Sequence, residues 1–266
     1  FVTNAEIGKN IKGKELLDQY DAVCLAIGSQ VPRNLPIEGR DLKGVYYAME
    51  YLTVQNKLVG QEEVPAEQII DAKGKNVLVI GGGDTGSDCI GTANRQGAAN
   101  VMQIEIMPKP PKSEDIENPW PNPFPTVLKT SSSHLEGCDR RWLVNTKRFI
   151  GENGVLTGAE LVEIAWEKDE AGKMIMKEVG KPEIHKIDLV FLALGFVHPI
   201  QEGLLAELGV KTDDVRRNVE TDKKRLTSVS KVFAAGDCVS GQSLVVTSIA
   251  SGRKTAKHID DFLKEN

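Results

Sequence analysis

Three glycines, Gly81, Gly83 and Gly86, have the G-x-G-x-x-G spacing that suits a phosphate-binding turn. The residues before them, 77–80, are all aliphatic, which predicts a buried strand that ends at the first glycine. A helix that begins after the turn would offer free amides and the positive end of its dipole to a pyrophosphate. The pattern therefore predicts a dinucleotide site, with a purely structural turn as the alternative. Its candidate residues are Gly81, Gly82, Gly83, Asp84, Thr85 and Gly86.

The end of the second strand should decide between NAD and NADP. A carboxylate there would bind the ribose 2'-hydroxyl, and a cation would bind a 2'-phosphate. We predict this strand over 101–107, which places Glu105 before its end, while Lys109 and Lys112 follow in the next loop. We therefore expect Lys109 to favour NADP(H). Glu105 leaves NAD open, and is otherwise a solvent-facing strand residue.

The flanking segments predict the elements that hold this turn. Residues 77–107 have the pattern of a strand, turn, helix and second strand, with Gly97 at the end of the helix. The pattern over 142–186, with turns at 152–154 and 169–172, predicts an antiparallel meander. Further predicted elements are helices at 14–19, 46–59 and 242–264, and buried strands at 22–27, 188–194 and 231–235.

The stretch 108–125 contains seven of the 12 prolines of the chain. Proline excludes a helix or a central strand there. Long loops inside compact domains are either functional or disordered, and Trp120 and Phe124 are candidate aromatic anchors. We predict an ordered loop with a packing role.

The composition excludes several classes of function. The chain has 33 Lys and Arg against 38 Asp and Glu, a net charge of -5, and no basic block. This argues against a nucleic-acid or anionic-membrane surface. No apolar run approaches the roughly 20 residues that a membrane span needs. We therefore expect a cytoplasmic protein.

The cysteines and histidines do not have the spacing of metal ligands or catalytic groups. The cysteines lie far apart, which predicts reduced thiols and neither a zinc nor a dithiol centre. A serine run, 131–133, precedes His134 but lacks the context of a nucleophile elbow, so surface or loop roles are expected for the histidines. The residues concerned are Cys24, Cys89, Cys138 and Cys238, and His134, His185, His198 and His258.

Two segments flank the glycine turn at matching positions, and each is a buried strand that runs into Ala-x-Gly, at Gly28 and Gly195. With the later Gly236 and Asp237, this arrangement resembles the flavoproteins that have two dinucleotide-binding domains. The resemblance implies an α/β fold in which a Rossmann-like NAD(P) domain with an antiparallel β-meander is inserted into an incomplete FAD-binding α/β domain. We accordingly expect an NADP-binding domain over 49–196, and a partial FAD-binding domain over 1–48 and 197–266.

The same resemblance implies roles for the segments around the insertion. In that family the Ala-x-Gly strands mark the two crossings between domains. Gly236 and Asp237 would hold the ribityl and phosphate portion of the flavin. The following helix would point its N-terminus at the flavin ring, where its dipole favours the anionic reduced form. This would place Ser243, Leu244 and Val245 near the flavin. No catalytic side chain is expected, because hydride passes between the cofactors themselves.

Five segments narrow the resemblance to the small (beta) subunits of bacterial NADPH-dependent glutamate synthases: IEIMPKPP, NPWP, KTSSSH, VNTKRF and GQSLVVTSIASGR. The resemblance covers essentially the whole chain. It implies hydride transfer from NADPH to FAD, and electron transfer through 4Fe-4S clusters to the large subunit, which makes glutamate from glutamine and 2-oxoglutarate.

The departures from that pattern concern both cofactors. Many relatives have arginines after the second strand, where this chain has MPKPPK. The family's cysteine-rich iron-sulfur region and its first glycine turn, for the FAD pyrophosphate, lie N-terminal to anything present here. We therefore expect a C-terminal part of the subunit that is inactive by itself.

Two alternatives remain open. One is the electron-input module of a related flavoprotein, similar to the NADPH-oxidising half of dihydropyrimidine dehydrogenase. The other is a non-catalytic nucleotide-binding or subunit-docking module. A thioredoxin reductase is disfavoured, because the inserted domain contains no Cys-x-x-Cys.

Overall fold

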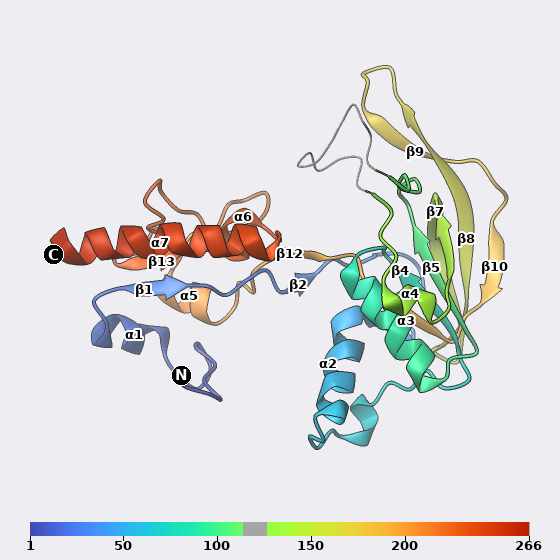
Figure 1. Cartoon of the computed structure of the whole chain (residues 1–266), viewed down its shortest axis with the longest axis horizontal. Helices are drawn as coiled ribbons and strands as arrows, with labels where there is room; N and C mark the ends of the chain where they lie inside the picture. The colour runs from blue at the N-terminus through green and yellow to red at the C-terminus, as the bar shows by residue number, and fades with distance from the viewer. Residues whose placement is uncertain (114–126, 266) are drawn as a thin grey trace. The chain divides into compact units, whose positions relative to one another are not determined.

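The computed structural model describes residues 1–113 and 127–265, and the chain divides into two compact units (Figure 1). Unit 1 comprises Phe1–Arg33 and Gly195–Asn266, and unit 2 comprises Asn34–Leu194. We expected the first boundary after residue 48. It falls earlier because β3 (Val45–Tyr47) pairs with β11 (Leu189–Leu192), within unit 2.

Unit 2 is built on a five-stranded parallel sheet. Its central strand is β4 (Asn76–Ile80), which lies between β11 and β5 (Asn100–Glu105). The edges are β3 and β6 (Asp139–Trp142), and every neighbouring pair in the order β3-β11-β4-β5-β6 is parallel. The carboxyl ends of all five strands therefore lie along one edge of the sheet, which is where ligands bind in open α/β sheets.

Alternation along β4 creates the two layers that cover this sheet. Val77 and Val79 belong to a buried cluster with the helices, and Leu78 and Ile80 belong to a cluster with the meander. Figure 1 shows the helices α2 (Ala48–Val59) and α3 (Asp84–Gln96) on one side of the parallel sheet. The long strands β7 (Val144–Glu152) and β8 (Val155–Lys168) lie on the other side. The remaining elements of unit 2 are η1 (Ala66–Gln68), α4 (Ser132–Leu135), β9 (Met174–Glu178) and β10 (Glu183–Lys186).

The predicted antiparallel meander is confirmed. The long strand β8 pairs antiparallel with β7, β9 and β10. The first turn has positive φ at Asn153 and Gly154, 51° and 77°, which suits a tight hairpin. The meander begins at Val144 rather than at Trp142, because Trp142 belongs to β6 of the parallel sheet.

Unit 1 is built around two parallel strands, β1 (Val23–Leu25) and β13 (Val232–Ala234). Their buried side chains pack with those of α5 (Leu204–Leu208) and with Cys238. The last helix, predicted to begin at about residue 242, begins three residues later, at Val245. A short helix, α6 (Asp237–Ser240), precedes it and ends at Gly241, which has φ +81°. The other elements of unit 1 are α1 (Gly13–Gln19), β2 (Val31–Pro32), β12 (Phe196–His198) and α7 (Val245–Glu265).

Two further sequence-based expectations concern the proline-rich loop and membrane-spanning helices. Of the proline-rich stretch 108–125, the structure describes 108–113, which form neither helix nor strand. The predicted anchoring by Trp120 and Phe124 lies outside the described residues. Among the helices of the described ranges, none combines the length and the hydropathy that crossing a membrane requires.

Candidate functional site

The glycine turn joins β4 to α3, and the geometry gives a separate reason for glycine at each motif position. Gly81 has φ +117°, and a Cβ there would lie 2.3 Å from the carbonyl oxygen of Ala193. At Gly86 a Cβ would lie 2.5 Å from the carbonyl oxygen of Gly81, so a side chain would push α3 away from the turn. At Gly83 a Cβ would meet nothing within 4 Å. The first and third glycines therefore hold the turn together, and the second leaves open space in front of it.

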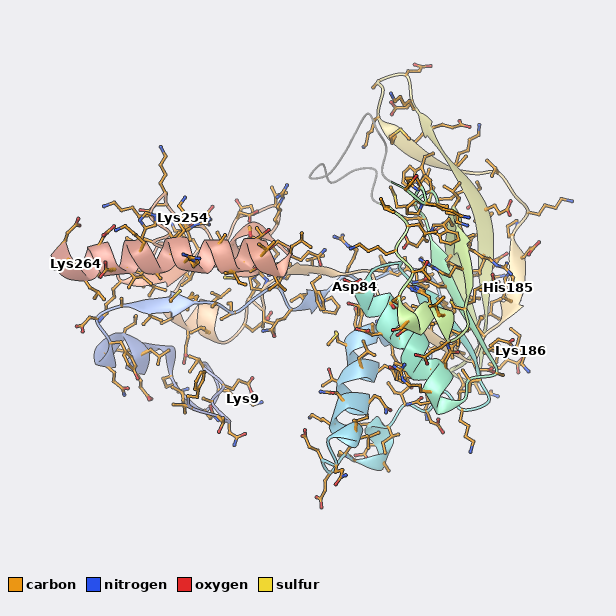
Figure 2. The ribbon with its side chains drawn as sticks, in the orientation of Figure 1. Lys9, Asp84, His185, Lys186, Lys254 and Lys264 are labelled. Atoms are coloured by element: carbon orange, nitrogen blue, oxygen red, sulfur yellow. The ribbon has the colours of Figure 1, made fainter. Side chains whose placement is uncertain are left out.

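The start of α3 keeps its hydrogen-bond donors free within the described part of the chain. The first helical bond runs from the Ser87 amide to the Gly83 carbonyl, at 3.1 Å, and no side chain caps the helix. Figure 2 places Asp84 at this end of α3. Thr85 lines a groove between α2 and α3 instead of the space before the turn. The amides before Ser87 and the helix dipole are therefore available to an anion.

Glu105 is the last residue of β5, and its carboxylate lies against the turn. A Cβ added at Gly82 would lie 0.9 Å from Glu105 Oε1, so only glycine fits there without moving Glu105. Burial raises the pKa of the Glu105 carboxyl, and Arg140 opposes that rise. The prediction that the strand ends at residue 107 was wrong, because β5 ends at Glu105. The alternative that Glu105 is only a solvent-facing strand residue was also wrong, because its carboxylate lies against Gly82. This carboxylate occupies the strand end where a ribose-binding acid is found in NAD sites.

A cavity of about 650 Å³ opens beside the turn. Lys109 Nζ lies 4.7 Å from the centroid of the Trp142 ring, and Arg140 Cζ lies 5.1 Å from the same centroid. Cations over an aromatic face are attracted to it, so Trp142 helps to hold both positive charges at the cavity wall. The wall includes Gly82, Gly83, Asp84, Ser87, Glu105, Lys109, Lys129, Ser131, His134, Arg140 and Trp142.

One buried amide, that of Gln103, connects the turn to the basic wall. Gln103 is 2% exposed, and its Nε2 donates to the Gly81 carbonyl at 2.9 Å. Its Oε1 accepts from Arg140 Nε at 3.1 Å and pairs with His134 Nε2 at 3.2 Å. Because His134 Nδ1 accepts the Ser131 amide, Nε2 carries the proton and donates to Gln103.

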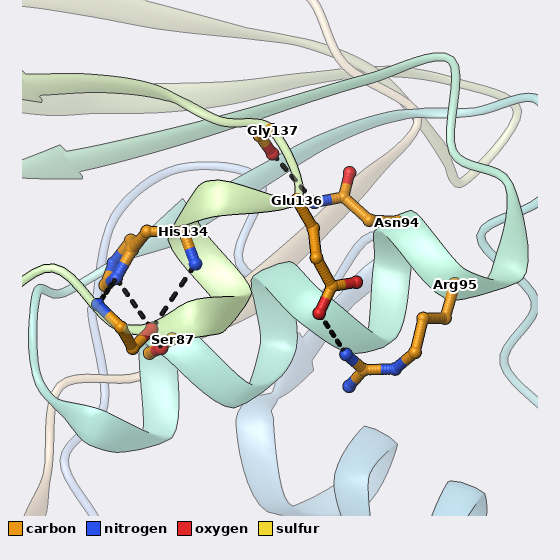
Figure 3. A network of polar contacts seen from close by, with 7 residues as sticks. Ser87, Asn94, Arg95, His134, Glu136 and Gly137 are labelled. Atoms are coloured by element: carbon orange, nitrogen blue, oxygen red, sulfur yellow. Dashed lines mark hydrogen bonds and ion pairs between the residues drawn. The ribbon is translucent and has the colours of Figure 1, made fainter.

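The short helix α4 is fixed along α3, which keeps His134 in place. Three polar contacts join the two segments: Ser87 with Ser131, Asn94 with Gly137, and Arg95 with Glu136 (Figure 3). Gly91 on α3 permits the close approach, because a Cβ there would lie 2.6 Å from Ser133 Oγ. The Ser131 hydroxyl also accepts from the His134 amide and caps α4.

We expect His134 to titrate below the ordinary histidine range. Burial lowers its pKa from 6.5, and Arg140 lowers that pKa further. A proton on Nδ1 would also remove the acceptor of the Ser131 amide. Because the folded-state pKa lies below the unfolded value, His134 favours the folded state at higher pH, and this contribution is lost as the pH falls below about 6.5.

NMR titration of the imidazole checks this expectation. The pKa of His134 should rise towards 6.5 in Arg140→Gln, and it should not change in Arg141→Gln. Arg141 is the matched control because its charge is paired with Asp139 at 2.8 Å. A pKa that is the same in wild type and Arg140→Gln would contradict the assignment.

Unit 1 contains the Gly236 and Asp237 pair at the start of α6. Asp237 Oδ1 accepts from the hydroxyls of Ser243 and Ser248, both at 2.8 Å. The Gly236 amide donates to Ser251 Oγ at 3.0 Å. The carboxylate and the turn are therefore fixed against the beginning of α7.

The other candidate residues of unit 1 lie at the start of α7 and at the two Ala-x-Gly segments. Leu244 and Val245 are 71% and 76% exposed. The strands that follow the two Ala-x-Gly segments, β2 and β12, pair antiparallel. Gly195 packs against the Gln242 side chain, whereas a Cβ at Gly28 would meet nothing within 4 Å.

The structure therefore brings together part of the candidate set and adds residues that sequence reasoning missed. The glycine turn, Asp84 and Lys109 share one cavity, and Thr85 does not line it. The missed residues are Gln103, His134, Arg140 and Trp142. Two signals pointed to them: Gln103 is polar inside an aliphatic strand, and Arg140 and Trp142 stand two residues apart on one strand face.

The expected roles of the histidines were incomplete, because His134 belongs to the cavity wall. His185 lies on β10, where it pairs with Glu183 at 3.6 Å. All four cysteines are free, and burial raises the pKa of the Cys138 thiol to about 11. Over residues 1–113 and 127–265, no three His, Cys, Asp or Glu side chains gather in a way that could hold a metal ion.

A parallel sheet with a glycine turn at its carboxyl edge, inserted between two segments that form a second unit, defines a two-unit α/β dinucleotide-binding protein. The chain belongs to the pyridine nucleotide-disulphide oxidoreductase family, whose family model matches residues 2–252. The resemblance to the two-domain flavoproteins and the predicted α/β fold class are therefore confirmed.

Curated relatives cover nearly the whole chain. It is 45% identical over 97% of its length to "Glutamate synthase [NADH]" of Schizosaccharomyces pombe, of which it spans 13%. It is 43% identical over 99% of its length to "Glutamate synthase [NADPH] small chain" of Mycobacterium tuberculosis, of which it spans 53%. The chain thus spans about half the length of the small chain that it matches.

The fold is also that of Mycobacterium tuberculosis FprA, solved in complex with NADPH. The TM-score is 0.68 at 19% identity, over 98% of this chain and 67% of FprA.

Proposed function

We propose that this chain is the electron-input part of a glutamate synthase, in which unit 2 binds NADPH and unit 1 contributes half of an FAD site. The observation that carries the proposal is the open space at Gly83 beside a basic cavity. The names of the two glutamate synthase relatives, and the NADPH complex of FprA, support it.

The side chains of this chain would bind and orient the cofactors. When bound, NADPH supplies a hydride and FAD accepts it, so no side chain need act as an acid or base. Residues 81–86 and the start of α3 would hold the pyrophosphate of NADPH, and Lys109 would meet its 2'-phosphate. Unit 1 would meet the flavin through Gly236, Asp237, Ser243, Leu244 and Val245.

The arrangement of unit 1 fits the flavin role in two respects. Asp237 is already a hydrogen-bond acceptor for hydroxyl groups, which is the chemistry that a ribityl chain offers. The start of α7 is exposed and apolar, and its dipole would favour a reduced, anionic ring. Gly28 and Gly195 would mark the two crossings between the units.

In the whole protein we propose that electrons pass through 4Fe-4S clusters, in a region outside this chain, to a large subunit. That subunit would form glutamate from glutamine and 2-oxoglutarate, in the cytoplasm. The Schizosaccharomyces pombe relative is a much longer single chain, so the same role is compatible with a fused large region.

Calorimetric titration with NADPH and NADH tests the dinucleotide site. We expect NADPH to bind more tightly, because Lys109 and the basic wall favour a 2'-phosphate. Lys109→Ala should weaken NADPH binding and leave NADH binding unchanged. Lys112→Ala is the matched control, because it removes the same charge from the same loop outside the cavity wall.

The other outcomes are equally informative. Equal binding of NADPH and NADH, at millimolar affinity or weaker, would contradict the proposal that residues 81–86 form a dinucleotide site. A clear preference for NADH would assign selectivity to Glu105, and Glu105→Gln should then weaken NADH binding.

A further inference from the structure

The loop after β5 carries no arginine. Residues 106–112 have the sequence IMPKPPK, and Lys109 from this segment lines the cavity, as does Lys129 further along the same connection. An arginine enters the same wall from the neighbouring strand. Because β6 runs parallel to β5, with Arg140 in register with Gln103, the Arg140 side chain lies beside Gln103 and lines the cavity next to the turn.

Arg140 is held along one side of its guanidinium group. Its Nε donates to Gln103 Oε1, and its Nη1 donates to the Lys129 carbonyl at 3.1 Å and to Thr130 Oγ1 at 3.4 Å. Its Nη2 has no acceptor among the described residues. A guanidinium that is fixed in this way loses little freedom when it binds an anion.

We propose that Arg140 recognises the 2'-phosphate of NADPH, and that Gln103 is its positioning residue. The proposal rests on the function proposed above and deepens it by naming the specificity-determining cation. Since Nε and Nη1 already donate within the protein, Nη2 is the donor that Arg140 offers to a phosphate, and the rigid guanidinium plane fixes its direction, whereas a lysine acts as a mobile point charge. Arg140 would therefore discriminate by geometry, and Lys109 would add charge.

The charge of Glu105 makes such a cation necessary for NADPH. Its carboxylate lies against Gly82 and would repel a phosphate placed near the end of β5. The positive charge of Arg140 lowers the pKa of the Glu105 carboxyl, against the rise that burial causes. A ligand without the 2'-phosphate would lack this repulsion and would gain nothing from Arg140.

Gln103 links the two halves of the site. The same side chain donates to the Gly81 carbonyl in the pyrophosphate turn and accepts from Arg140 Nε. Because it is buried, it has few alternative orientations. Its loss would leave Arg140 with its contacts to residues 129 and 130 but without its central acceptor.

The test is calorimetric titration of the chain with NADPH, NADH, 2',5'-ADP and 5'-ADP. In Arg140→Gln, affinity for NADPH and 2',5'-ADP should fall by about 10- to 100-fold, the range for losing hydrogen bonds between charged groups. Affinity for NADH and 5'-ADP should change by no more than about twofold. Arg141→Gln removes the same charge from the same strand, where it pairs with Asp139, and should leave all four affinities unchanged.

Gln103 is tested by the ratio of NADPH to NADH affinity. Gln103→Leu should lower this ratio. A residue with only a structural role would lower both affinities together and leave the ratio unchanged, so an unchanged ratio in Gln103→Leu would overturn the positioning role.

Failure of the inference differs from failure of the proposed function. If wild type binds neither nucleotide, the function is wrong. If wild type binds NADPH and Arg140→Gln binds it equally well, or loses NADPH and NADH equally, the function stands and the role of Arg140 is overturned.

Discussion

Gly83→Val should abolish dinucleotide binding and leave the fold intact. Gly83 has φ -77° and ψ -178°, an extended conformation that a β-branched residue adopts without strain. Its Cβ would meet nothing within 4 Å, so the new side chain would project into the space in front of the turn. A pyrophosphate would then lose the amides at the start of α3. The loss of two hydrogen bonds from these amides to the charged pyrophosphate should weaken NADPH binding by about 100-fold or more.

Calorimetry measures this loss, and thermal unfolding measures the fold. The melting temperature of Gly83→Val should stay within about 2 °C of wild type, since surface substitutions usually change stability by less than about 0.5 kcal/mol. Gly86→Ala is the contrasting variant, because its Cβ would lie 2.5 Å from the Gly81 carbonyl oxygen. Overpacking of this kind costs about 1–3 kcal/mol, so its melting temperature should fall by several degrees. Undiminished NADPH binding by Gly83→Val would mean that nucleotide does not enter at this turn.

The strand, turn and helix around 81–86 could be predicted because their determinants are local. The aliphatic run of β4, the glycine spacing and Gly97, which ends α3 with φ +85°, all lie within one continuous segment. The pairing of β4 with β5 follows from the helix between them, since a crossover helix returns the chain in parallel. The local sequence pattern is therefore sufficient to predict β4, the glycine turn, α3 and β5.

The cavity wall could not be predicted in the same way, because its contacts join distant segments. Arg140 bonds to Gln103 across 37 positions, and Ser87 meets Ser131 across 44. The contact between Arg140 and Gln103 exists because β6 joins the edge of the sheet beside β5. All four residues of that short strand are charged or aromatic, so it lacks the aliphatic run that is typical of a buried parallel strand, and the sequence pattern alone does not assign it to the sheet.

The sequence analysis placed the end of β5 two residues too late, and this error affected the prediction of coenzyme preference. Ile106 and Met107 extend the apolar run of the strand, but both are exposed, 44% and 52%, because the strand ends before them. Glu105 therefore lies at the strand end, against the turn, instead of on a solvated strand face. In the proposed site, coenzyme choice would depend on the balance between this carboxylate and Arg140, and neither position follows from residue spacing.

We expect the purified chain to be colourless and unable to reduce a dye with NADPH, although it binds NADPH. It contains one G-x-G-x-x-G turn, and that turn lies in unit 2. The FAD contacts proposed for unit 1 address the ribityl chain and the ring, through Asp237 and the start of α7. A pyrophosphate is normally held by a glycine turn and a helix N-terminus, so without them FAD affinity should fall by about 100-fold or more.

The measurements are the visible absorbance of the purified chain, a fluorescence titration with FAD, and a dye-reduction assay with NADPH. The whole small chain of the Mycobacterium tuberculosis relative, and the part of it that aligns with this chain, form a matched pair. The whole protein should be yellow and active, and the aligned part should be neither. Stoichiometric flavin in the 266-residue chain would show that the Asp237 turn and α7 hold FAD without a second glycine turn. The proposal that unit 1 contributes only half of an FAD site would then be wrong.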